Sequence, residues 1–178
     1  MAEAERTYEK QFNERELFVL ELEKPEDFPA HLALTGPRFS CLLAWDAREV
    51  DAAVIAQLAR KLLDAGAVYI CTWGPGRERI HDIVNQRSNG QQINDQQAAG
   101  PNPPPAASRV VVTTGHEEDP LAEAIWHALY CSMPDEPLAE GCGSTLGITI
   151  GSPAWAADVR AAFSDPIGFN SRLLHQQH

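Results

Sequence analysis

Two short runs of hydrophobic residues stand out along the chain because neither contains a charged side chain. They are FSCLLAW at residues 39–45 and AVYICTW at residues 67–73. Continuous apolar runs of this length are typical of strands buried on both faces of a parallel sheet. RVVVTT at 109–114 and STLGITI at 144–150 fit the same pattern. We therefore predict four buried strands.

Each predicted strand is followed by a stretch with helical periodicity. After the first strand, Val50, Val54 and Leu58 lie one turn apart, which is typical of a helix with one buried face. Similar stripes occur within residues 80–84, 121–129 and 153–163. Four repeats of strand and helix predict a Rossmann-like three-layer α/β sandwich, with a mainly parallel sheet of four to five strands and helices on both faces.

The ends of the chain and one internal stretch lack this pattern. Residues 1–16 are mostly polar, which predicts a mobile N-terminal arm or a frayed helix. Residues 17–23, LFVLELE, end in apolar and acidic alternation that favours an edge strand. We expect a single α/β domain over residues 17–166, with a flexible Gln/Pro-rich insertion at 87–108 and a C-terminal tail at 167–178.

Composition narrows the classes of partner. Asp and Glu number 25 against 14 Lys and Arg, so the formal net charge is −11. We expect neither nucleic acid nor a membrane as a partner, since anionic phosphate repels such a chain. The four cysteines form no C-x-x-C pair, and the charged N-terminal stretch lacks the apolar core of a signal peptide. These features predict a cytoplasmic protein with reduced thiols.

Candidate chemistry is sought where the parallel strands end, because ligands of open parallel sheets bind at the carboxyl ends of the strands. Asp46 directly follows the first buried strand, and Glu49 comes three residues later. This spacing favours a helix cap in which Asp46 is the N-cap residue and Glu49 completes a capping box. The alternative is a strand-end carboxylate that binds Mg²⁺ or acts as a base or nucleophile.

A second candidate group follows the third buried strand. His116, Glu117 and Glu118 lie between that strand and the next helix. A histidine beside carboxylates can exchange protons near neutral pH, so Asp46, His116 and Glu117 are candidate catalytic residues. Asp46, His116 and Glu118 are candidate ligands of a metal ion. The competing interpretation is a solvated acidic loop, which is common on an acidic protein.

The second buried strand ends in a turn that offers a different chemistry. Trp73, Gly74, Gly76 and Arg77 follow one another there, and Trp45 ends the first strand. Backbone N–H groups and Arg77 could hold an anion, while the two indoles could form a flat apolar wall. We assign these five residues as candidate ligand-binding residues. The turn matches neither dinucleotide-binding nor P-loop motifs, and a tight turn with tryptophans at the rim of the core is the alternative.

Three longer motifs carry a resemblance to known proteins. They are CLLAWDA (41–47), YICTWGPGRERIHDI (69–83) and TTGHEEDPLAEAIWHAL (113–129). These motifs resemble a family of small bacterial α/β proteins whose function is uncharacterised. The resemblance spans roughly residues 39–130 and implies a bacterial, intracellular, self-contained domain. It implies no activity, ligand or catalytic residue.

Two classes of function remain open. The first is an accessory or regulatory module that binds a partner protein or a small ligand and requires no cofactor, with a homodimer as a candidate assembly. The second is a metal-assisted hydrolase or phosphoryl-transfer enzyme that uses a divalent metal at the strand ends. A sugar or nucleotide sensor with Trp45 and Trp73 as a stacking wall lies between them. The absence of a complete catalytic motif favours the binding module.

Overall fold

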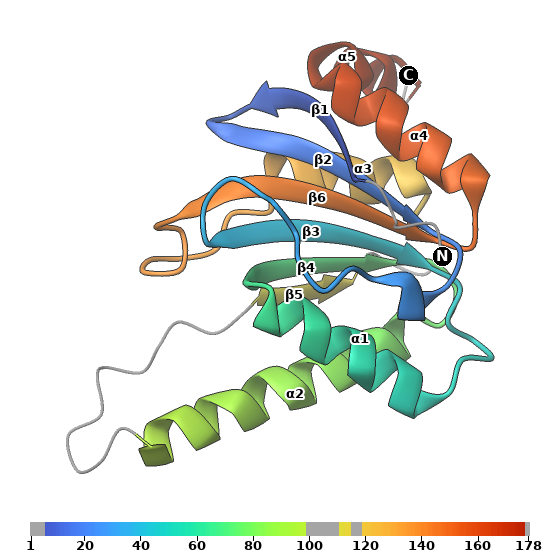
Figure 1. Cartoon of the computed structure of the whole chain (residues 1–178). Coiled ribbons are helices and arrows are strands. Elements are labelled where there is room, and N and C mark those ends of the chain that lie inside the picture. The colour runs from blue at the N-terminus through green and yellow to red at the C-terminus, as the bar shows by residue number, and fades with distance from the viewer. Residues whose placement is uncertain (1–5, 99–110, 115–118, 177–178) are drawn as a thin grey trace.

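The computed structural model of the chain describes residues 6–98, 111–114 and 119–176 (Figure 1). Strands and helices alternate over most of this length. In chain order the elements are β1 (Arg6–Phe12), β2 (Arg15–Leu22), the short 3₁₀ helix η1 (Pro25–Asp27), β3 (Arg38–Trp45), α1 (Ala52–Asp64), β4 (Ala67–Trp73), α2 (Arg77–Ala98), β5 (Val111–Thr114), α3 (Leu121–Tyr130), β6 (Cys142–Ile150), α4 (Pro153–Ser164) and α5 (Pro166–Gln176).

The described strands form one sheet of six strands in the order β1-β2-β6-β3-β4-β5. Strand β1 is antiparallel to β2, and every other neighbouring pair is parallel. The α/β class and the mainly parallel sheet are therefore confirmed. Strand β6 is the last strand in the sequence, yet it lies between β2 and β3. The connection from β2 to β3 must therefore cross β6.

The described sheet has one strand more than the four to five predicted, and the additional strand is β1. Residues 6–12 were expected to belong to a polar arm, but they pair with β2. Two ring contacts hold this edge strand in place. Tyr8 packs edge-on against Phe18 with ring centres 5.6 Å apart, and Phe12 packs against Tyr130 at 5.2 Å. These contacts join residues on separate elements, so the local pattern of residues 6–12 does not reveal them.

Helices cover both faces of the sheet (Figure 1). Consecutive side chains of a strand point to opposite faces, so Leu42 and Leu43 of β3 enter different cores. Leu43 packs in the core that contains Ile55 of α1, on the face also covered by α2. Leu42 packs in the core that contains Ile125 of α3 and Phe163 of α4. Both cores are sealed from water, since all five side chains are at most 1% exposed.

Helix α2 corrects the predicted extent of the insertion at 87–108. The helix continues to Ala98, so residues 87–98 are helical, while 99–108 lie outside the described residues. Glutamine has a good intrinsic helix propensity. Ile80 and Val84 bury the first turns of α2 in the core. The polar continuation extends from that buried start, although it contains little that could pack.

Two further observations bear on the class of protein. Cys41, Cys71 and Cys142 are buried, Cys131 is exposed, and all four are free thiols. Within the described part of the chain, no helix combines the length and the apolar character needed to cross a lipid bilayer.

Candidate functional site

The order of the strands creates a switch point between β3 and β6. From β3 the chain passes through α1 to β4, on one side of β3. Strand β6 lies on the other side of β3 and continues into α4, which packs on the opposite face of the sheet. Ligands of open α/β sheets bind in the crevice that such a reversal opens at the carboxyl ends of the strands.

A pocket of about 730 Å³ lies at this switch point. It is bordered by the ends of β2, β3 and β6 and by the loop between β3 and α1. Its volume is in the range of small-molecule sites. The residues that line it are Glu23, Lys24, Pro25, Glu26, Trp45, Asp46, Arg48, Glu49, Val50, Val54, Ile150 and Gly151.

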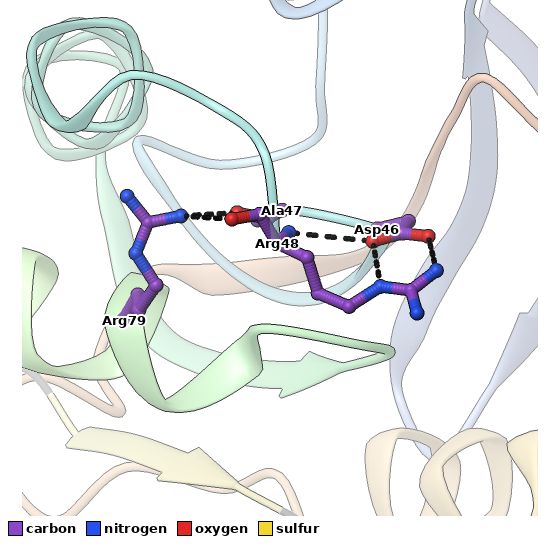
Figure 2. Close-up of polar contacts among 4 residues, drawn as sticks. All are labelled: Asp46, Ala47, Arg48 and Arg79. Atoms are coloured by element: carbon purple, nitrogen blue, oxygen red, sulfur yellow. Dashed lines mark hydrogen bonds and ion pairs between the residues drawn. The ribbon is translucent and has the colours of Figure 1, made fainter.

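Asp46 lines the pocket, and the Arg48 guanidinium forms a bidentate ion pair with it (Figure 2). Arg48 donates from Nε to Oδ1 of Asp46 at 3.0 Å and from Nη2 to Oδ2 at 2.6 Å. The backbone N–H of Arg48 also points to Oδ1, at 3.3 Å. Hydrogen bonding from the Arg48 side chain holds the pKa of the Asp46 carboxyl below its usual value, against a small opposing effect of burial. Asp46 is therefore an ionised carboxylate with both oxygens already bonded.

The capping role predicted for Asp46 is wrong. Helix α1 begins at Ala52, and its N-cap is Asp51, whose carboxylate accepts a hydrogen bond from the Ala53 N–H at 2.7 Å. Glu49 consequently lies in the loop before the helix and lines the pocket. Helix α4 has a serine cap, because Ser152 Oγ accepts from the Trp155 N–H at 3.3 Å.

Arg79 of α2 fixes the loop that carries Asp46 (Figure 2). Its Nη1 donates to the carbonyl oxygens of Ala47 at 2.6 Å and Arg48 at 2.8 Å, and its Nη2 donates to that of Val50 at 2.8 Å. One planar guanidinium thus collects three backbone acceptors of the same loop. Because a lysine ammonium lacks this fork, Arg79 has a role that lysine could fill only in part.

The glycines of the turn between β4 and α2 let this turn approach the Asp46 loop. Both adopt positive φ, +111° at Gly74 and +78° at Gly76. A Cβ on Gly74 would lie 2.5 Å from the carbonyl oxygen of Trp45, and one on Gly76 would lie 2.8 Å from the backbone of Ala47. The Ala47 N–H donates to the carbonyl oxygen of Pro75 at 2.8 Å. Contact between two backbones therefore explains both glycines.

The ligand-binding residues assigned from the sequence lie in neighbouring turns, but most of them do not line the switch-point pocket. Gly74, Gly76 and Arg77 are not among the residues that line the pocket, and Arg77 is only 8% exposed. Trp45 packs in the core on the α1 face, whereas Trp73 packs in the core on the α3 and α4 face. The two indoles thus do not form one wall.

Trp73 has partners of its own on that second face. Its Nε1 donates to the carbonyl oxygen of Asp119 at 2.9 Å. Its ring meets Trp155 edge-on, with the ring centres 5.1 Å apart. Of the two tryptophans assigned to ligand binding, Trp45 is the one that lines the switch-point pocket.

The proposed catalytic and metal-binding group is only partly visible. Asp46 is described, but His116, Glu117 and Glu118 lie outside the described residues. Within residues 6–98, 111–114 and 119–176, no three His, Cys, Asp or Glu side chains are grouped so that they could hold a metal ion. The hypotheses that involve His116 and its neighbours remain predictions.

Sequence reasoning missed the part of the pocket that follows β2. Glu23, Lys24 and Glu26 lie just beyond the end of that strand. The strand-end rule points to the ends of the four buried strands, whereas the alternation at residues 17–23 predicts an edge strand and draws no attention to its end. The alternation in that stretch carried no sign that β2 would pair in parallel with β6.

Comparison with known proteins places the chain in a family. No curated protein matches it. A family model described as "Domain of unknown function (DUF7684)" matches residues 17–166, the same span as the α/β domain expected from the sequence. The match leaves out β1 and nearly all of α5. Because it covers most of the chain, the protein belongs to the DUF7684 family.

Proposed function

We propose that this protein is an accessory or regulatory module that binds a small ligand in the switch-point pocket. The observation that carries the proposal is the position of the pocket, at the carboxyl ends of β2, β3 and β6 where the strand order reverses. The proposal includes the bacterial, cytoplasmic, Rossmann-like setting that the sequence suggested.

The state of Asp46 favours binding over metal-assisted hydrolysis. Arg48 donates hydrogen bonds to both oxygens of Asp46, and the resulting fall in the pKa of the carboxyl makes it a weaker base. An ionised, bidentate pair at the rim of a pocket is instead suited to shaping that rim and fixing its charge. The enzyme hypothesis therefore has to use a carboxylate whose charge Arg48 already neutralises.

The test is a thermal-unfolding panel with Mg²⁺, Mn²⁺, Zn²⁺, nucleotides, sugar phosphates, simple anions and small amines. A ligand at 100 times its Kd stabilises the folded state by about 2.7 kcal/mol. For a chain of this size, the corresponding rise in Tm is about 5–10 °C. We expect at least one organic compound to produce such a rise.

A pocket-filling variant shows where that compound binds. Val54 lines the pocket from α1, so Val54→Trp should abolish the shift in Tm. Ala157→Trp is the matched control, because Ala157 is an exposed position of α4 that does not line the pocket. The proposal would be overturned if no compound raised Tm. It would also be overturned if the rise in Tm were equally large in Val54→Trp. A shift that only a divalent ion causes, and that Asp46→Asn removes, would support the enzyme hypothesis instead.

A further inference from the structure

The charges around the switch-point pocket are unbalanced. Four of its lining residues are carboxylates and two are cations, which leaves a formal charge of −2. Asp46 and Arg48 neutralise each other in their bidentate pair. The excess therefore comes from Glu23, Glu26 and Glu49, against which Lys24 is the remaining cation.

In the part of the chain that the structure describes, none of these three carboxylates forms a direct ion pair, and Glu49 interacts with Arg48 only through its charge. The described ion pairs of Asp and Glu side chains with Arg or His involve Asp46, Asp82, Glu9, Glu21 and Asp165. None involves Glu23, Glu26 or Glu49, and all three side chains are exposed. The pocket thus presents unpaired negative charge on one side.

The floor of the pocket adds an apolar surface with a single donor. Val50, Val54 and Ile150 contribute aliphatic groups beside the Trp45 indole. Trp45 is 4% exposed, and no described residue accepts a hydrogen bond from its N–H. The indole nitrogen is not fully enclosed, since it is not one of the enclosed polar atoms without a hydrogen-bond partner. The N–H is therefore not enclosed by the described protein, and because Trp45 lines the pocket we assign this N–H as the donor to a ligand oxygen.

We infer that the pocket takes a small organic cation, an amine on an apolar body that also carries an oxygen acceptor. The ammonium group lies toward Glu23, Glu26 and Glu49, the apolar body covers Val54 and Ile150, and the oxygen accepts from the Trp45 N–H. This assignment rests on the proposed function and specifies the chemical class of its ligand.

The experiment compares three compounds with the same body and different charge. Tyramine carries +1 at neutral pH, tyrosol is neutral, and 3-(4-hydroxyphenyl)propionate carries −1. Titration calorimetry on the whole chain at low ionic strength should give the tightest binding for tyramine. We expect the propionate to bind about 10-fold more weakly or worse, since Coulomb attraction becomes repulsion. The difference should shrink as salt is added.

Variants separate the pocket from the overall charge of the protein. Glu26→Gln and Glu49→Gln should each weaken tyramine binding about two- to five-fold and leave tyrosol unchanged. Glu140→Gln removes the same charge at an exposed position outside the pocket and should change neither. Trp45→Phe should weaken all three compounds by a similar factor, with an unfolding scan to show that the variant is folded.

The possible outcomes are distinguishable. Equal or reversed affinities across the series would overturn the cationic ligand class, and so would Gln variants that bind tyramine like the parent. Equal binding to Trp45→Phe would overturn the role of the N–H. If none of the three binds while a compound without an amine shifts Tm and Val54→Trp blocks that shift, the ligand class is wrong and the proposed function stands. If nothing in any panel binds, both fail.

Discussion

Replacing Arg79 with alanine removes three hydrogen bonds to one loop and leaves the rest of that loop unchanged. The bond to the Ala47 carbonyl is partly buried, and the bonds to the Arg48 and Val50 carbonyls are exposed. A hydrogen bond contributes about 0.5–1.5 kcal/mol, and exposure to solvent brings the contribution toward the lower value. Taking the upper value for Ala47 and the lower for the other two, we expect a loss of about 2.5 kcal/mol.

This loss should appear in the free energy of unfolding and in local exchange. A loss of about 2.5 kcal/mol lowers Tm by about 5–10 °C in a chain of this size. The Ala47 amide, which donates to Pro75, should exchange with solvent faster because the loop moves more freely. Arg79→Lys should fall between the parent and Arg79→Ala, since its ammonium cannot span all three carbonyls.

The control lies on the same helix. Arg87 is exposed on α2, so Arg87→Ala removes the same charge and side-chain type without touching the loop. If Arg79→Ala lowers Tm no more than Arg87→Ala does, and the Ala47 amide exchanges at the parent rate, then the three hydrogen bonds do not hold the loop. The contact between the two backbones would then be sufficient by itself.

Two further predictions concern the same corner of the fold. Gly74→Ala should lower the free energy of unfolding by about 2–4 kcal/mol, because the position has positive φ and the new Cβ would collide with the Trp45 carbonyl. The control is Gly90→Ala, where nothing lies within 4 Å of the new Cβ. Urea unfolding of this control should show a gain of about 0.5–1 kcal/mol. The lowered pKa of Asp46 means that its contribution to stability is present above the pKa of an unfolded aspartate and is lost as pH falls through the folded value. An NMR titration of the Asp46 carboxyl should therefore give a pKa below the usual one that rises in Arg48→Gln, and an unchanged value in that variant would contradict the assignment.

The buried strands could be predicted from the sequence because a strand buried on both faces is a continuous run of apolar residues. The apolar run at 67–73 has the bounds of β4, and the run at 39–45 differs from β3 by one residue. Helix α4 covers the helical stripe predicted within residues 153–163, and a serine followed by proline is a local signal for its start. These features depend on residues that are neighbours in the chain.

The start of α1 could not be predicted, because its position depends on distant residues. Asp46 and Asp51 are both suitable N-caps. The choice between them is settled by Arg79 and by the turn at Gly74–Gly76, which hold residues 46–50 outside the helix. Arg79 and this turn come after β4 in the chain, and the residues near Asp46 give no indication that the chain returns to contact them.

The predicted wall of Trp45 and Trp73 does not form, because the two residues are offset by one position in the pairing of their strands. In the pairing of β3 with β4, Trp73 lies opposite Ala44, not Trp45. Side chains alternate along a strand, so an offset of one residue sends the two indoles to opposite faces. The composition of two strands does not determine their register, and the expected stacking site depended on that register.

The place of β6 in the sheet has a consequence for synthesis of the chain. On one side β6 pairs with β2, and on the other it pairs with β3, so it is the only link between the β1–β2 hairpin and the β3–β4–β5 part of the described sheet. A ribosome makes this central strand after the other five described strands. Until residues 142–150 have emerged, the nascent chain holds two sheet fragments whose facing edges have no partner. Such edges readily pair with other chains. The final strand therefore decides when the molecule ceases to be vulnerable to aggregation.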